Sequence, residues 1–175
     1  MIFTGEWSLA VKEAEATNAL ADQGCDVVTC HVDGPKVICE TAVSRDIFVC
    51  GYHADQTPIA GDKYLTGAEW NWANVYTDMV AKTLAGEPIP NFVRGGLADG
   101  FIKMSPLGPA VSDAARAQFE ATKAEIEAGG FAAIKGPLKD NKGNVIAAEG
   151  ESFVETDVAI ESMDYLVEGV IGSTS

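Results

Sequence analysis

Glycine and proline residues divide the chain into short apolar runs that alternate with longer amphipathic segments. The short runs predict strands at residues 1–4, 26–31, 47–51, 64–66, 92–94 and 101–104. The longer segments predict helices at 10–21, 34–44, 71–84 and 113–128, and a terminal helical segment at 160–170. This alternation predicts an α/β domain whose sheet is mainly parallel and flanked by helices, with right-handed crossovers.

Cap and turn signals refine these boundaries. Ser8 is a credible N-cap for the first helix, whose inward face should carry Val11, Ala14 and Leu20, and Gly24 should end it. Ser112 precedes the helix at 113–128, which Gly129 should close. Residues 139–144 are typical of a hairpin turn. We expect a ligand-binding lobe at 1–144, and a tail at 145–175 that leaves the main sheet and packs on a crossover or a partner lobe.

The overall charge restricts the partners of the chain. With 26 acidic and 12 basic residues among 175, the formal net charge is −14, so the chain should not bind nucleic acid or anionic membranes. No apolar run approaches the roughly 20 residues of a transmembrane helix. The first residues do not resemble a signal peptide, which suggests either a cytoplasmic protein or a missing N-terminal part.

Four cysteines lie within 26 consecutive residues, at positions 25, 30, 39 and 50, without the spacing of a zinc site. They are interpreted as small apolar residues in or beside strands. An oxidising compartment would also allow a disulfide such as Cys30–Cys39 or Cys25–Cys50, and the sequence does not decide between these states.

Polar and aromatic side chains follow three of the predicted strands. Because ligands bind outside the carboxyl ends of parallel strands, these positions are the first candidates for a site. The residues concerned are Thr29, His31 and Asp33 after the first of these strands, His53 and Asp55 after the second, and Glu69, Trp70 and Asn71 after the third.

The two histidines allow three interpretations. With Asp33 and Asp55 they could bind zinc or iron, and a metal-dependent hydrolase of small molecules is therefore an alternative function. They could also be hydrogen-bonded, inert loop residues. We favour a third interpretation, in which His31 and His53 are polar contacts to an organic ligand, with no metal and no cofactor.

Tryptophans near the same edge indicate what kind of ligand this would be. At least one of Trp70 and Trp72 should pack under the following helix, and the other could stack on a flat ring. Trp7, which precedes the first helix, is a third candidate of this kind. The motifs of serine hydrolases, P-loop proteins and dinucleotide-binding enzymes are absent from the sequence, which favours a binding protein over an enzyme.

A set of ordered motifs runs along the whole chain. These motifs are T4-G-E-W7, K12-E-A-E-A16, D22-Q-G24, D26-V-V28, D55-Q56 after Gly51, Y64-L-T-G67, W70-N-W72, G95-G-L97, D99-G100, P106-L-G-P109, D140-N-K-G143 and 161–172. Together they resemble the basic membrane protein family, the substrate-binding lipoproteins of ABC importers that include purine nucleoside receptors. The resemblance implies one lobe of a type I periplasmic-binding-protein fold and an extracytoplasmic location. Members are usually about twice this length, so the chain resembles their carboxy-terminal half.

The resemblance also implies roles for individual residues. Asp55 matches an aspartate that contacts ribose in nucleoside-binding members, whereas Thr29 and His31 stand where those members have an aromatic or apolar contact. Trp70 takes the place of a ligand-binding lysine, which favours a flat and less polar ligand such as a free purine base. The expected partner is an ABC transporter permease. A truncated lobe that no longer binds a ligand is a further alternative.

A single lobe would expose apolar residues that normally meet the other lobe. We expect Phe3, Phe153, Tyr165 and Leu166 to be exposed in this way, and a homodimer or a domain swap to cover them.

Overall fold

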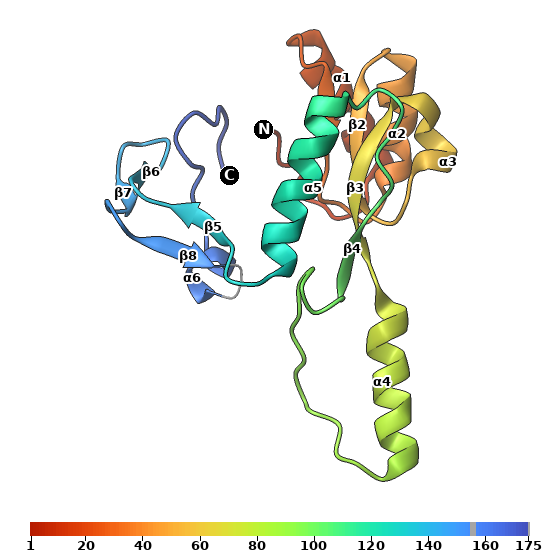
Figure 1. The fold of residues 1–175 in the computed structure, drawn as a ribbon. Coiled ribbons are helices and arrows are strands. Elements are labelled where there is room, and N and C mark those ends of the chain that lie inside the picture. Colours follow the sequence, from red (N-terminus) through yellow and green to blue (C-terminus); the bar gives the residue numbers. More distant parts are fainter. Residues whose placement is uncertain (155–156, 175) are drawn as a thin grey trace.

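A four-stranded sheet forms the centre of the protein in the computed structural model, which describes residues 1–154 and 157–174. Its strands lie in chain order: β1 (Val27–Thr29), β2 (Phe48–His53), β3 (Tyr64–Trp70) and β4 (Ile102–Met104). β1, β2 and β3 are parallel, and β4 is antiparallel to β3. The predicted α/β class with a mainly parallel sheet is therefore confirmed (Figure 1).

The main hydrophobic core lies between this sheet and two helices, α1 (Ala10–Asp22) and α2 (Pro35–Ser44). Val28 of β1 and Val49 of β2 pack with Cys39 and Ala42 of α2, and these last three residues are completely buried. Tyr64 of β3 completes this core, directly after a short helix, α3 (Thr57–Ala60), and a 3₁₀ turn, η1 (Gly61–Lys63). None of the helices in the described part of the chain is long and apolar enough to span a membrane.

Helix α4 (Trp72–Ala85) extends away from the sheet, and residues 86–101 run back beside it to β4 (Figure 1). Only Val75 of this helix is buried. Every fourth residue forms an exposed apolar stripe, the α4 stripe, made of Trp72, Tyr76, Val80 and Leu84. Four large apolar side chains exposed along one helix face are unusual in a soluble domain. Apolar surface stabilises a protein only when it is removed from water.

Helix α5 (Asp113–Glu127) separates the sheet from a group of small elements (Figure 1). Two hairpin-like sheets pair β5 (Ala132–Lys135) with β8 (Ser152–Val154) and β6 (Leu138–Lys139) with β7 (Val145–Ala147), and α6 (Val158–Glu161) follows. The N-terminal amine donates to the carbonyl oxygen of Ile171 at 2.7 Å, so the two described ends of the chain meet. The division at residue 144 stays a prediction.

Several predicted elements are confirmed, and others are wrong. Ser112 caps α5 by accepting from the Ala115 N–H at 3.2 Å, and the turn at 139–144 joins β6 to β7 as predicted. Residues 1–4 and 92–94 form no strand, and neither run pairs with a strand of the sheet. The helix predicted at 160–170 is reduced to α6, which ends at Glu161.

The first helix also differs from its prediction. Leu9, not Ser8, is the N-cap, and the buried Glu13 side chain accepts from the Leu9 N–H at 2.9 Å. Val11 is exposed, whereas Glu13 and Thr17 face inward. The first helix therefore buries two polar side chains, and the Glu13 carboxylate satisfies one of the free N–H groups at the helix N-terminus.

The apolar residues that were expected to lie open at the surface differ among themselves. Phe3 is exposed as expected, but Leu166 is buried, and Phe153 and Tyr165 are half-buried. The segment after β7 therefore covers part of its own apolar surface.

Candidate functional site

A continuous row of aromatic rings crosses the carboxyl end of the sheet. Neighbouring centroids lie 5.4 Å apart for Trp7 and His31, 4.5 Å for His31 and Tyr52, and 6.2 Å for Tyr52 and Trp70. The row continues onto α4 through Trp72 and Tyr76, which stack in turn at 5.5 and 5.7 Å. We call these six residues the aromatic row.

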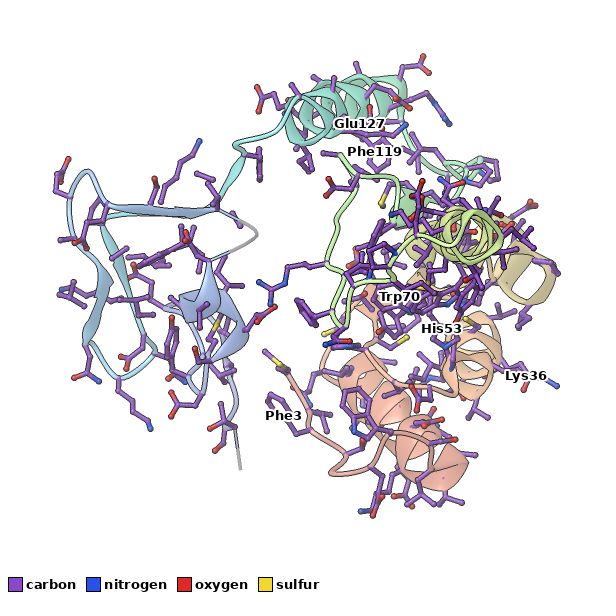
Figure 2. All side chains as sticks on the ribbon, turned by 90° about the horizontal axis from the view of Figure 1, so that it is seen from below. Phe3, Lys36, His53, Trp70, Phe119 and Glu127 are labelled. Atoms are coloured by element: carbon purple, nitrogen blue, oxygen red, sulfur yellow. The ribbon has the colours of Figure 1, made fainter. Side chains whose placement is uncertain are left out.

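The parallel strands explain why residues so far apart in sequence meet here. His31 follows β1, Tyr52 and His53 end β2, and Trp70 ends β3, so all of them emerge at one edge of the sheet. His53 contacts the Tyr52 ring at 5.1 Å, and Figure 2 shows His53 and Trp70 close together while Lys36 projects outward. The structure therefore brings together five predicted residues: Trp7, His31, Asp33, His53 and Trp70.

Three hydrogen bonds connect the segments that carry these rings. His31 Nε2 and the Tyr52 hydroxyl are 3.0 Å apart, and His53 Nε2 donates to the Asp33 carbonyl oxygen at 3.1 Å. The Asp33 N–H donates to the Trp7 carbonyl oxygen at 2.7 Å. Asp33 thus connects the segment before α1 to the end of β2 through its backbone. Burial, and then the nearby Asp33 charge, raise the pKa of Tyr52, so its hydroxyl stays protonated at neutral pH.

The backbone of His53 is in the left-handed region, with φ of 58°. Residues other than glycine rarely adopt this conformation, and asparagine, aspartate and histidine are among those that do so most often. Strained backbones of this kind gather at functional sites, because the surrounding structure must hold them in place. The hydrogen bond to Asp33, the contact with Tyr52 and the strand pairing with Glu69 of β3 hold His53 here.

Other predicted site residues are occupied by local contacts. Asp55 Oδ1 accepts from the N–H and the hydroxyl of Thr57, at 2.9 and 2.6 Å, and so holds the start of α3. The Asn71 side chain donates to the Gly100 carbonyl oxygen at 2.9 Å and fixes the glycine-rich turn. Thr29 is exposed on the edge strand β1 and does not belong to the aromatic row.

Glu69 is buried, and its carboxylate is bound on both oxygens. Oε1 accepts from the Ser105 hydroxyl at 2.7 Å, and Oε2 lies 3.0 Å from the Lys103 ammonium. Ser105 in turn lies 3.0 Å from the Tyr64 hydroxyl, so a buried polar chain joins β3 to β4. This chain holds the strand that presents Trp70.

A cavity of about 520 Å³ opens beside the end of the aromatic row. Its wall includes Trp70, Trp72, Tyr76, Phe92 and Phe101, with the Arg94–Glu161 ion pair at its rim. This volume is in the range of small-molecule sites. Trp70 is the predicted site residue that borders it, so the indole contacts both the Tyr52 ring and this apolar cavity.

The geometry lends no support to the metal-dependent alternative. Within residues 1–154 and 157–174, no three His, Cys, Asp or Glu side chains gather as a metal site would require. The four cysteines, all in the described part, are free thiols. Burial raises the pKa of Cys30 to about 12 and that of Cys39 to about 11, so both thiols are poor nucleophiles.

The sequence analysis missed Tyr52 and Tyr76 as site residues. Tyr52 directly follows the strand predicted at 47–51 and precedes His53, so the rule that selects His53 applies to Tyr52 as well. In the structure both residues belong to the end of β2. The place of Tyr52 at the carboxyl end of a parallel strand is therefore the signal that could have found it. Tyr76 could be found from its spacing of four residues after Trp72.

Comparison with known proteins identifies the family. The sequence model of the Bmp family, described as ABC transporter substrate-binding protein PnrA-like, matches residues 2–130. The chain belongs to this family. The resemblance stated from the sequence motifs is thereby confirmed.

Two curated relatives cover nearly the whole chain. A purine-binding protein of Brucella abortus is 31% identical over 97% of this chain and 47% of its own length. A putative ABC transporter glucose-binding protein of Haloferax volcanii is 28% identical over 90% of this chain and 37% of its own length. The chain therefore spans about half the length of these relatives or less.

Solved structures support the same fold. A transcriptional activator of the comK gene from Bacillus halodurans has a TM-score of 0.67 at 23% identity, covering 73% of this chain and 45% of that one. An ABC transporter solute-binding protein from Conexibacter woesei has a TM-score of 0.59 at 22% identity, covering 74% and 44%. At these identities the likeness concerns the fold alone.

Proposed function

We propose that this chain contributes to the substrate-binding component of an ABC importer and binds a flat heterocycle, with a free purine base as the preferred ligand. The observation that carries the proposal is the aromatic row, which passes through Trp70 at the carboxyl end of the sheet. Offset or edge-on packing against such rings stabilises a planar ligand.

Two further features support a purine. Polar atoms of His31, His53 and Asp33 surround Tyr52, which places hydrogen-bonding groups next to an aromatic surface. Small-molecule sites typically combine a mainly apolar wall with a few polar groups in this way. The name of the Brucella abortus relative also mentions purine.

The contacts we propose are those of the nine predicted residues, with Tyr52 added. Trp70, Tyr52 and Trp7 would supply ring surface, and His31, His53 and Asp33 would supply polar contacts. Thr29, Asp55, Glu69 and Asn71 would contribute from the rim or by holding the loops. A nucleoside should bind less tightly than a base, since Asp55 Oδ1 already accepts two hydrogen bonds from Thr57 and is less able to accept one from a ribose hydroxyl.

Isothermal titration with adenine, guanosine and glucose tests this function. We expect adenine to bind, and Trp70→Ala to weaken it at least about tenfold because a stacked ring is lost. Phe3→Ala is the control, since Phe3 is exposed and lies outside the row. Tighter binding of guanosine or glucose than of adenine, or an unchanged affinity in Trp70→Ala, would contradict the proposal.

Membership of the family also suggests a cellular location and a partner for the protein. We propose an extracytoplasmic location and an ABC permease as the partner, with no catalytic role for the chain. We further propose that two copies associate through the α4 stripe, which would remove its exposed apolar side chains from water.

A further inference from the structure

The hydrogen bond between His53 and Asp33 fixes which ring nitrogen of His53 carries the proton. Its partner is a backbone carbonyl oxygen, which can only accept, so Nε2 carries the hydrogen and donates it over 3.1 Å. In a neutral imidazole the other nitrogen, Nδ1, is then an acceptor. His31 differs, because the Tyr52 hydroxyl can donate or accept and so leaves its tautomer open.

The carboxylates around His53 are also acceptors. The loop after β1 supplies the exposed Asp33 carboxylate, and the chain after β2 supplies Asp55. On β3, Glu69 lies opposite His53 in the strand register, but Ser105 and Lys103 occupy its carboxylate. A ligand edge that meets this part of the site therefore faces acceptors and gains most by presenting N–H donors.

We propose that His53 is a specificity-determining residue that selects purines with an exocyclic amino group. The amino N–H would donate to Nδ1 of His53, whereas an oxo group in the same place would set an acceptor against an acceptor. This inference rests on the proposed function. The left-handed backbone at His53 fits it, because glycine would occupy that conformation without strain but would offer no acceptor.

Two substitutions separate the side chain from the backbone. Both His53→Gly and His53→Asn tolerate a positive φ, so both variants should fold. Asparagine keeps an acceptor oxygen, and glycine removes it. Circular dichroism of each variant checks the fold before binding is measured.

Titration calorimetry of adenine and hypoxanthine then tests the proposal at neutral pH. We expect the wild-type protein to bind adenine at least about tenfold more tightly than hypoxanthine, since an unmatched polar group weakens binding by about this factor. The ratio should fall below about threefold in His53→Gly and stay larger in His53→Asn.

Each other outcome has a defined meaning. Equal affinities in the wild type, a preference for hypoxanthine, or an unchanged ratio in His53→Gly would refute the role of His53 while leaving purine binding intact. Failure of both bases to bind would instead refute the proposed function, and the inference with it.

Discussion

Tyr52 and His31 share a hydrogen bond of 3.0 Å between the phenol oxygen and Nε2, which joins the end of β2 to the loop after β1. The two rings also pack edge to face at 4.5 Å. This pair thus contributes a ring contact to the aromatic row and places a hydrogen-bonded pair of polar atoms beside it.

Tyr52→Phe should separate these two effects. It removes the hydroxyl but keeps the ring, so the free energy of unfolding should fall by only about 0.5–1 kcal/mol, because the bond is exposed. Urea unfolding of Tyr52→Phe, His31→Ala and the double variant gives the coupling between the two side chains. Additive effects of the single substitutions would show that the hydrogen bond contributes nothing measurable.

Gly108 is a position where the backbone itself excludes a side chain. A Cβ there would lie 1.8 Å from the Tyr64 carbonyl oxygen, and the Gly108 N–H donates to the Leu65 carbonyl oxygen at 2.8 Å. Gly108→Ala should therefore separate the segment after β4 from β3 and cost several kcal/mol, about 3 or more.

Gly24→Ala is the matched control for Gly108→Ala. Gly24 has φ of +87°, and a Cβ added there would meet no atom within 4 Å, so alanine costs only the backbone strain, about 1 kcal/mol. Thermal melts of both variants test the difference. Equal losses of stability would show that the close approach at Gly108 relaxes freely.

The sequence predicted the elements whose periodicity and caps agree. Helix α5 combines a serine N-cap, an amphipathic pattern and a closing glycine, and its observed start at Asp113 matches the prediction. The run at 92–94 has the apolar composition of a strand, but a strand also needs a neighbour, and composition cannot show whether one is present.

The site shows the same limit. That His31, His53 and Trp70 meet follows from the parallel topology alone. That Glu69 is bound to Lys103 and Ser105, while its neighbour Trp70 joins the row, depends on the β3–β4 register, which the sequence does not encode locally. The sequence thus predicts which residues gather at the carboxyl end of the sheet, but not which of them contact a ligand and which hold the strands.

Substitutions of Glu69 test whether this residue positions β3 or contacts the ligand. Glu69→Ala removes the acceptor of the buried Ser105 hydroxyl and should cost about 1–3 kcal/mol of stability, and Glu69→Gln should cost less because the amide oxygen still accepts. Chemical denaturation measures both. If Glu69 only positions β3, adenine affinity in Glu69→Gln should stay within about threefold of the wild type; a larger loss would make it a ligand contact.

The partly buried Cys30 thiol predicts a loss of stability at alkaline pH. The pKa of Cys30 is raised from 9.0 to about 12, so the folded state keeps a proton that the unfolded state releases. Its contribution is therefore complete below about pH 9 and is lost as the pH rises toward 12. Between pH 8 and 11 the free energy of unfolding should decrease less steeply with pH in Cys30→Ala than in the wild type.

Cys25→Ala is the control for this pH series, because Cys25 does not belong to the core cluster that Cys30 contacts. The free energy of unfolding of Cys25→Ala should decrease with pH as steeply as that of the wild type. An equally steep decrease in Cys30→Ala would show that other groups, such as the tyrosines, cause the alkaline decline.

The α4 stripe predicts self-association that depends on concentration. Leu84 is 85% exposed and Val80 is 57% exposed, and both lie on the same side of the helix as Trp72 and Tyr76. If two copies bury these side chains against each other, Val80→Glu should shift the molecular mass measured by light scattering from dimer to monomer, because an unpaired buried charge is strongly unfavourable. Ala81→Glu is the control, since Ala81 is exposed and lies one position after Val80, about 100° further round the same helix and outside the stripe. A monomer at high concentration in the wild type would contradict the dimer, and a dimer that survives Val80→Glu would place its interface elsewhere on the molecule.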